Sequence, residues 1–299
     1  MPKTARPRRS VLYMPGSNAR ALEKAKAIPA DGLILDLEDA VAPDAKETAR
    51  AQVCDAVKGG GYGMRELIIR TNALSTRWGY EDIAAASKSG CDAILLPKVE
   101  SADAIRQMEM IMNANGAPPS MTIWAMMETP HSVLESHNIA ESTKRMECLV
   151  MGTSDLAKEL DCTHTRERLP MITSLGLCML AARAAGLAVL DGVYLDLADA
   201  DGFEFACHQG AELGFDGKTL IHPKQVAPCN KVFTPKIEDV EWSRKIIAAH
   251  EDAAARGEGV CVVDGRLIEN LHVESARRLV KMAEAIDKME ADTAAAAAE

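Results

Sequence analysis

Short apolar runs alternate with helical stretches along most of this 299-residue chain, and this alternation restricts its fold more than any other feature. The runs have the length of strands and contain few polar residues, as expected of strands buried on both faces. Eight such runs are predicted, at residues 11–14, 32–35, 66–69, 93–96, 122–127, 149–151, 188–193 and 215–220. Eight parallel strands joined by helices form a closed barrel. The predicted fold class is therefore α/β, a (β/α)8 TIM barrel.

Helical patterns fill most of the connections, and the chain changes character near its C-terminal end. The predicted helices span residues 18–26, 44–57, 80–88, 102–113, 156–160 and 171–185. From residue 237 the pattern is helical, with one break at residues 257–265. We therefore predict a barrel catalytic domain over residues 1–235 and a C-terminal helical extension, or lid, over residues 236–299.

Composition excludes several classes of partner. The formal charge of −10 argues against general affinity for nucleic acid or an anionic membrane surface. No apolar run approaches the roughly 20 residues of a membrane helix, and residues 1–10 are basic without the apolar segment of a secretory signal. The eight cysteines form no CxxC pair, which is typical of buried thiols in a reducing compartment. We expect a cytoplasmic protein.

Polar side chains follow most of the predicted strands at the point where each strand ends. In a (β/α)8 barrel these ends converge on one rim, which carries the active site. A single strand-end acid is more often a helix cap or an ion-pair partner, but several acids and bases on one rim favour a functional site. The set comprises Asp36, Glu38, Asp39, Arg70, Lys98, Glu128, Asp155, Lys218 and His222.

Two of these acids are suited to a divalent cation. Glu128 ends the fifth run, which Pro130 prevents from continuing, and Asp155 follows the sixth. Mg²⁺ prefers oxygen ligands and is typically held by one or two carboxylates together with substrate oxygens and water. We predict a Mg²⁺ site at Glu128 and Asp155, which Mn²⁺ could also fill. For Asp155 the alternative is a helix cap, because it directly precedes a predicted helix.

Arg70 is the basic residue best suited to bind a substrate. Its planar guanidinium matches a carboxylate with two parallel hydrogen bonds. The alternative is a structural ion pair with Glu38 or Asp39. Lys98 and Lys218 are candidates for a Schiff base, but the strand-end acids favour metal-dependent chemistry instead.

Taken together, these motifs resemble the citrate lyase β-subunit-like family, which includes malyl-CoA and citramalyl-CoA lyases and lies within the HpcH/HpaI aldolase superfamily. The matching motifs include Leu35-Asp36-Leu37-Glu38-Asp39, Ile69-Arg70-Thr71-Asn72 and Glu128-Thr129-Pro130. The others lie at residues 9–16, 96–100, 191–194, 217–218 and 221–225, so the resemblance runs in order along most of the chain.

The resemblance implies a Mg²⁺-dependent carbon–carbon lyase. Such an enzyme cleaves a 3-hydroxyacyl-CoA thioester (citramalyl-CoA, malyl-CoA or β-methylmalyl-CoA) into acetyl-CoA or propionyl-CoA and a 2-oxo acid, pyruvate or glyoxylate, in reversible Claisen-type chemistry. It also implies a homotrimer or hexamer whose partners are small molecules, with coenzyme A as part of the substrate.

The resemblance also assigns roles to individual residues. Glu128 and Asp155 are implied as Mg²⁺ and substrate ligands, Arg70 as the group that binds the oxo-acid carboxylate, and Ser154 as a substrate contact. Glu38 and Asp39 are implied to orient Arg70 and metal-bound water. The coenzyme A contacts implied are Tyr13, Met14, Asn18, Lys24, Ile221 and His222.

The C-terminal extension departs from the family pattern at one position. The family's lyases carry a Gly-Lys/Arg-Met/Leu-Ile-Asp motif whose Asp is the acid/base in a neighbouring subunit's site. This chain has Gly265-Arg266-Leu267-Ile268-Glu269, with Glu269 in that place and Asp264 as a nearby substitute. The additional methylene changes the reach of the carboxylate by roughly 1 Å, and a misplacement of that size can lower a rate about 10²-fold.

Three other functions stay open. The first is the β subunit of a citrate lyase, in which an acyl carrier protein takes the place of coenzyme A. The second is a malyl-CoA thioesterase, which hydrolyses the thioester. The third is a non-catalytic CoA-thioester-binding assembly component, and Glu269 is the feature that favours it. Pyruvate and glyoxylate differ by one methyl group, worth only about 1–3 kcal/mol of discrimination, so the sequence does not select the acyl group.

Overall fold

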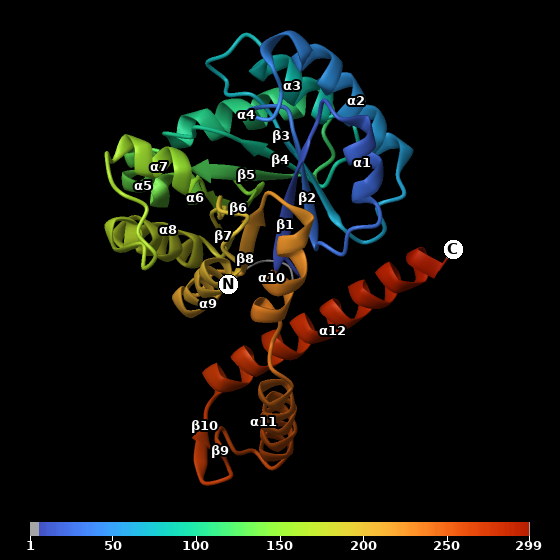
Figure 1. The fold of residues 1–299 in the computed structure, drawn as a ribbon. Helices are drawn as coiled ribbons and strands as arrows, with labels where there is room; N and C mark the ends of the chain where they lie inside the picture. Colours follow the sequence, from blue (N-terminus) through green and yellow to red (C-terminus); the bar gives the residue numbers. More distant parts are fainter. Residues whose placement is uncertain (1–5, 299) are drawn as a thin grey trace.

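The computed structural model describes residues 6–298, and its central strands close into a parallel barrel (Figure 1). Each strand pairs in parallel with the next, and β1 pairs with β8 to complete the ring. The predicted (β/α)8 fold is confirmed. The strands are β1 (Ser10–Pro15), β2 (Gly32–Asp36), β3 (Glu66–Arg70), β4 (Ala93–Leu96), β5 (Thr122–Met127), β6 (Met146–Met151), β7 (Ala188–Asp191) and β8 (Gly217–Leu220).

Helices surround the barrel. They are α1 (Ala19–Ala25), α2 (Lys46–Gly59), α3 (Gly79–Ala86), α4 (Ala102–Ala114), α5 (Pro130–Leu134), α6 (Ser136–Ala140), α7 (Thr153–Glu159), α8 (Ile172–Ala185), α9 (Ala200–Leu213) and α10 (Val226–Phe233). Sequence analysis missed α5, α6, α9 and α10. Pro130, which it used only to end a strand, is the first residue of α5 and follows a capping box made by Thr129 and Ser132.

The strands separate two apolar layers. Alternate side chains fill the barrel interior, among them Val11, Ile34, Ile68, Trp124 and Val150. The intervening residues join a larger cluster between the strands and the helices. Because both faces of every strand are buried, the strands read as continuous apolar runs in the sequence.

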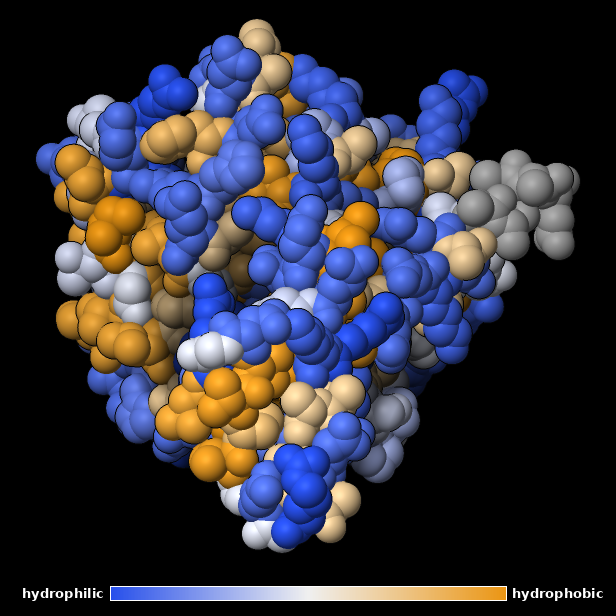
Figure 2. All heavy atoms as spheres, turned by 90° about the horizontal axis from the view of Figure 1, so that it is seen from below, coloured by the Kyte–Doolittle hydropathy of each residue, from blue (hydrophilic) through white to orange (hydrophobic). Residues whose placement is uncertain are grey.

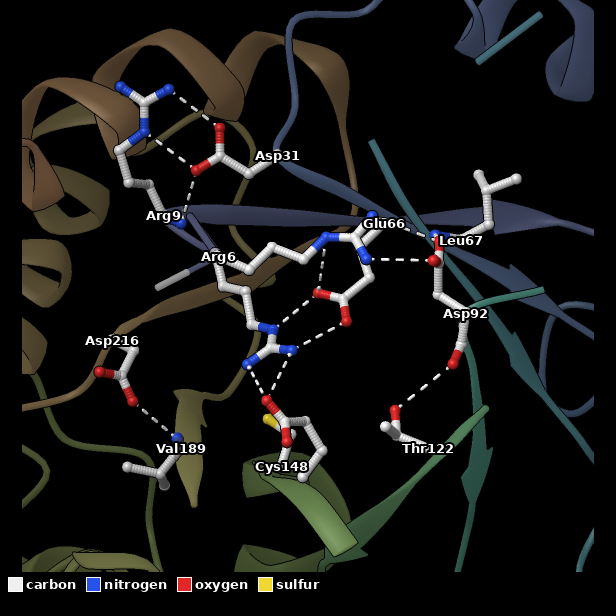
Figure 3. Close-up of polar contacts among 12 residues, drawn as sticks. Arg6, Arg9, Asp31, Glu66, Leu67, Asp92, Thr122, Cys148, Val189 and Asp216 are labelled. Atoms are coloured by element: carbon white, nitrogen blue, oxygen red, sulfur yellow. Dashed lines mark hydrogen bonds and ion pairs between the residues drawn. The ribbon is translucent and has the colours of Figure 1, made fainter. Parts of the chain in front are cut away.

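Buried ion pairs close the barrel at the amino ends of its strands (Figure 3). Arg8 lies across this opening, with its guanidinium 5.2 Å from the centre of the Trp124 ring. It donates to both carboxylate oxygens of Glu66, at 2.6 and 2.8 Å, and to Glu147 at 3.3 Å. The buried side chain of Arg9 points away from the barrel interior and pairs with Asp31. This end of the barrel is therefore sealed, and any opening for a ligand lies at the other end.

The C-terminal segment projects from the barrel (Figure 1). It consists of α11 (Ile237–Ala255), β9 (Cys261–Val263), β10 (Arg266–Ile268) and α12 (Asn270–Ala298). The break predicted at residues 257–265 contains an antiparallel hairpin, which turns at Asp264 and Gly265 with positive φ angles. The segment has a small core of its own, formed by Ile246, Val263, Ile268, Val273 and Ala276.

The last helix also contacts the barrel. Glu290 accepts a hydrogen bond from Arg9 at 2.8 Å, and Asp292 accepts one from the Met64 N–H at 3.1 Å. On the face viewed from below, hydrophobic side chains form several separate patches among hydrophilic ones (Figure 2). Within residues 6–298, none of the helices combines the length and the apolar character required to traverse a bilayer.

Candidate active site

A cavity of about 370 Å³ opens at the carboxyl ends of the strands. It lies at the opposite end of the barrel from the Arg8 ion pairs. Its lining comes from nearly every part of the rim and includes both acidic and apolar side chains. The lining residues are Tyr13, Asp36, Asp39, Ala40, Arg70, Met126, Glu128, Met151, Gly152, Thr153, Ser154, Asp155, Val193, Leu195, Thr219 and Ile221.

Arg70 lies on the cavity wall at the end of β3, and three carboxylates hold it. Its Nε and Nη2 donate to the two oxygens of Asp36 at 2.6 and 2.7 Å. Its Nη1 is 2.8 Å from Glu38 and 3.4 Å from Asp39. The Tyr13 ring covers the guanidinium, with its centre 4.8 Å away. Arg70 thus forms the ion pairs of one predicted alternative, and it also faces the cavity, as the substrate-binding alternative requires.

Acids outnumber bases around this cavity. The cations that the structure pairs with acids at this rim are Arg70 and Lys98. The acids at the rim are Asp36, Glu38, Asp39, Glu128 and Asp155. Burial raises the pKa of Glu38 to about 7. The neighbouring acids reinforce this shift, and Arg70 opposes it. Burial also raises the pKa of Glu128, although the Lys98 N–H and ammonium oppose the shift. The rim therefore favours an additional positive charge.

Glu128 follows β5 and is almost fully buried, with 2% of its surface exposed. Its Oε1 accepts a hydrogen bond from the Lys98 backbone N–H at 2.7 Å. Its other face lies against Gly152, where a Cβ atom would come within 2.3 Å of the Glu128 Cβ and 2.6 Å of its Oε2. Gly152 immediately precedes α7, whose first turn carries Asp155. The close approach at Gly152 thus brings the end of β5 against the start of α7.

Lys98 joins the two acids of the predicted metal site. Its backbone binds Glu128, and its Nζ lies 3.0 Å from Asp155 Oδ2. Asp155 forms no side-chain cap in α7, since no capping hydrogen bond is made at the start of that helix. Asp155 instead lines the cavity together with Ser154.

The residues present fit a hard divalent cation. Two carboxylates from adjacent strand ends line one cavity, and carboxylate oxygens are the donors that Mg²⁺ prefers. Burial and neighbouring acids disfavour the charged form of Glu128, a cost that a bound cation would offset. The described residues contain no cluster of three or more His, Cys, Asp or Glu side chains arranged for a metal, so such an ion would depend on water and substrate oxygens.

The predicted coenzyme A contacts divide into two groups. Tyr13 and Ile221 line the cavity. Met14 belongs to the cluster behind the strands, Asn18 caps α1 by accepting from the Ala21 N–H, and Lys24 lies exposed on the same helix. His222 accepts a hydrogen bond from the Lys224 N–H. The role of all six residues in binding coenzyme A stays a prediction.

Glu269 lies outside the cavity lining. It is an exposed residue between β10 and α12, and its backbone N–H donates to His272 Nδ1. Asp264, the alternative acid, pairs with Lys245 at 2.6 Å. Both belong to the projecting segment, and neither lines the cavity of its own chain.

Sequence analysis placed Asp36 at this rim but did not pair it with Arg70. Asp36 is the main partner of Arg70, and its position two residues after the inward-facing Ile34 is the signal that could have indicated this. Gly152, Thr153, Leu195 and Thr219 complete the wall. Lys218, by contrast, is buried away from the cavity and pairs with Asp191 at 2.8 Å, so it is not placed to form a Schiff base.

Comparison with known proteins places this site in context. Residues 9–223 match the model of the family described as HpcH/HpaI aldolase/citrate lyase. The chain is 47% identical to a (3S)-malyl-CoA thioesterase of Cereibacter sphaeroides over 96% of this chain and 98% of that protein. It is 33% identical to the citrate lyase subunit beta of Escherichia coli, over 94% and 95%, and to an L-malyl-CoA/beta-methylmalyl-CoA lyase of C. sphaeroides, over 94% and 96%.

A solved structure shares the same architecture. The chain superposes with a TM-score of 0.71 and 27% identity on CitE from Mycobacterium tuberculosis, which was crystallised with magnesium, acetoacetate and coenzyme A. The match covers 92% of this chain and 97% of that one.

Proposed function

Because the chain belongs to the HpcH/HpaI aldolase/citrate lyase family, we propose that it is an enzyme that acts on the CoA thioester of a short 3-hydroxy dicarboxylic acid. We propose (3S)-malyl-CoA as the substrate and hydrolysis of its thioester as the reaction. The 47% identity to a (3S)-malyl-CoA thioesterase, over nearly the full length of both chains, carries this proposal.

The cavity supports a substrate with a free carboxylate. Such a group requires positive charge, and Arg70 is the guanidinium that faces the cavity. Its contact with Asp39 is the weakest of the three, at 3.4 Å with Asp39 largely exposed, whereas Asp36 holds it with two short hydrogen bonds. We infer that Nη1 exchanges Asp39 for the substrate carboxylate while Asp36 fixes the orientation of the guanidinium.

Glu128 and Asp155 would hold a divalent cation, Mg²⁺ or Mn²⁺, and the M. tuberculosis structure crystallised with magnesium supports this choice. When bound, the cation would supply Lewis-acid polarisation of the substrate oxygens. Glu128 contributes a buried, fixed carboxylate, and Asp155 contributes a more exposed one at the edge of the cavity. Arg70 and these two acids would together orient the 3-hydroxy acid end of the substrate.

Carbon–carbon cleavage is the second candidate, and the match to the aldolase/citrate lyase family model favours it. In this reaction the 3-hydroxyl loses its proton, the bond between C2 and C3 breaks, and the acetyl-CoA enolate takes up a proton at carbon. Glu269 from a neighbouring copy would donate that proton. Malyl-CoA would yield glyoxylate, and citramalyl-CoA would yield pyruvate.

One assay separates the two reactions. The protein is incubated with (3S)-malyl-CoA and Mg²⁺, and both free thiol and glyoxylate are measured. Hydrolysis releases free CoA thiol and malate, whereas cleavage releases acetyl-CoA and glyoxylate without free thiol. We expect thiol release without matching glyoxylate.

The matched variant for this assay is Glu128→Gln, which keeps the shape of the side chain but removes its charge. We expect its rate to fall more than about 100-fold, because even residues that only support metal ligands contribute 10–100-fold. Full activity of Glu128→Gln, or of the wild-type protein in excess chelator, would contradict the metal assignment. If the amount of glyoxylate formed equals the amount of substrate consumed, the reaction is carbon–carbon cleavage and the proposal of hydrolysis is wrong.

A further inference from the structure

Lys98 has an unusual backbone conformation. It follows β4 at the rim of the barrel, and its φ angle of 51° lies in the left-handed region. Residues with a Cβ atom rarely adopt this conformation, which costs free energy unless surrounding contacts stabilise it. At Lys98 the contacts that accompany it are with the two acids of the proposed metal site, Glu128 and Asp155.

These two contacts differ in kind. Glu128 is held by the Lys98 backbone N–H at 2.7 Å, a contact that any residue except proline would make at this position. Asp155 is held by the side-chain ammonium, with Nζ 3.0 Å from Oδ2. Both side chains of this ion pair are partly exposed, at 48% for Lys98 and 35% for Asp155. Only the second contact is therefore easily exchanged.

We propose that the Lys98 ammonium is the built-in counter-ion of this acidic site, which neutralises Asp155 when no divalent cation is bound and leaves Asp155 when one binds. This inference rests on the proposed metal site. Among the residues that the structure describes, Arg70 is the other cation paired with acids of the rim, and three of those acids already surround it. The Lys98 side chain would therefore compete directly with the metal.

Competition predicts the direction of a mutational effect. A neutral side chain at position 98 keeps the N–H bond to Glu128 but removes both the ion pair that a metal must break and the repulsion between two cations. Binding of a divalent cation should then become tighter. If Lys98 instead mainly ordered the two acids for the metal, its removal would weaken binding.

The test measures Mn²⁺ binding to chelator-treated full-length protein by isothermal titration calorimetry, without substrate. We expect Lys98→Met to bind Mn²⁺ about two- to tenfold more tightly than wild type, from the size of a partly exposed ion pair plus the repulsion between cations. Lys98→Asn is the second variant, because asparagine tolerates a left-handed backbone and its folding is therefore secure. Lys88→Met is the control, since exposed Lys88 lies after α3 at the other end of β4.

The outcomes are distinct. Tighter binding in both Lys98 variants, with Lys88→Met unchanged, supports the proposal. Equal or weaker binding in the Lys98 variants overturns it while leaving the metal site intact. An equal gain in Lys88→Met also overturns it, because the effect would then be one of net charge. Failure of wild-type protein to bind Mn²⁺ both alone and with added malate, whose oxygens stand in for those of the substrate, would reject the metal site itself.

Discussion

Single residues determine the charge balance of the cavity, and Arg70 shows how closely they are coupled. Sequence analysis offered two interpretations for Arg70, a substrate contact or an ion pair with Glu38 or Asp39. The structure adds Asp36, which accepts hydrogen bonds from two of the three guanidinium nitrogens, Nε and Nη2. A buried guanidinium with one exchangeable contact is more rigid than a free surface arginine, and this rigidity favours oriented binding of a substrate carboxylate.

Glu38 should make stability depend on pH in a defined interval. Its pKa is about 7 in the folded protein, above its ordinary value of 4.5, so between these values the native state binds more protons than the unfolded state. Raising the pH from about 4.5 to about 7 therefore lowers the free energy of unfolding. Glu38→Gln removes this loss, and the variant should gain up to about 3 kcal/mol over wild type across that interval.

The measurement is urea unfolding of both proteins in chelator at several pH values. The difference between them should be constant below pH 4.5 and above pH 7. A difference that did not change between these values would show that the Glu38 carboxyl is not perturbed by folding.

The sequence predicted which acids lie at the rim, because they follow strand ends. It did not predict which side chains at the rim bind one another. The strands are apolar on both faces, so the sequence does not show which of two neighbouring residues points inward. This is why Glu128 and Asp155 were identified while the partnership of Asp36 with Arg70, and the contact of the Lys98 backbone with Glu128, were missed. The Lys98 contact accompanies a left-handed backbone conformation, which a lysine in the sequence does not indicate.

At the scale of elements, the junction of β5 with α7 depends on Gly152. A methyl group there would collide with Glu128, as its Cβ would lie 2.3 Å from the Glu128 Cβ. Gly152→Ala should therefore displace Glu128 and weaken Mn²⁺ binding at least about tenfold, since shifts near 1 Å at a site are costly. Calorimetric titration checks this expectation.

Gly176→Ala is the matched control. Gly176 lies within α8, and nothing lies within 4 Å of the Cβ that it lacks. This substitution should leave Mn²⁺ affinity unchanged and stabilise the helix by about 0.5–1 kcal/mol. Equal affinity in Gly152→Ala would show that the Glu128 position tolerates this displacement.

A buried ion cluster fixes the end of β7. Asp191 is fully buried and bonds to Lys218 on β8 and to Arg168 before α8. Burial alone would raise the pKa of Asp191, but the two cations lower it. Asp191→Asn leaves both cations without their partner, so the free energy of unfolding should fall by about 3–5 kcal/mol.

Denaturant unfolding measures this loss. The control is Asp264→Asn, which breaks the exposed pair with Lys245 and should cost less than about 1 kcal/mol. A loss of similar size in both variants would contradict the assigned role of burial.

Element prediction failed where local signals were weak. Helix α9 contains Gly202 and Gly210, which lower its helical propensity, and α5 and α6 span only five residues each. The hairpin formed by β9 and β10 read only as a break in a helical pattern, because strands of three residues are too short to show alternation.

At the scale of the whole molecule, the projecting segment is suited to contact another copy of the chain. Its hairpin exposes Val262 and Leu267, with 67% and 56% of their surfaces accessible, and Leu271 lies nearby at the start of α12. We propose, as the family resemblance implied, that the segment reaches the cavity of a neighbouring subunit and presents Glu269 there.

Complementation between two variants, each expected to lack carbon–carbon cleavage activity, tests this arrangement by the glyoxylate that mixed oligomers release. Glu128→Gln and Glu269→Gln chains are co-expressed with different tags, and mixed oligomers are purified. If the two acids meet across an interface, random mixing restores up to about a quarter of wild-type sites. If each chain supplies both acids to its own site, every site keeps one defect and no activity returns. Each variant purified alone is the control.

Closure of the barrel has a consequence for synthesis of the chain. The first strand, β1, needs β8 as a neighbour: Lys218 donates its backbone N–H to Arg9, and the Arg8 carbonyl approaches Gly217 so closely that a Cβ there would lie 1.8 Å away. At 5–20 residues per second, ribosomes take roughly 10–40 s to add the intervening 200 or so residues. During that time one edge of an apolar strand has no partner. Nascent chains of this protein should therefore bind chaperones until residue 220 has emerged.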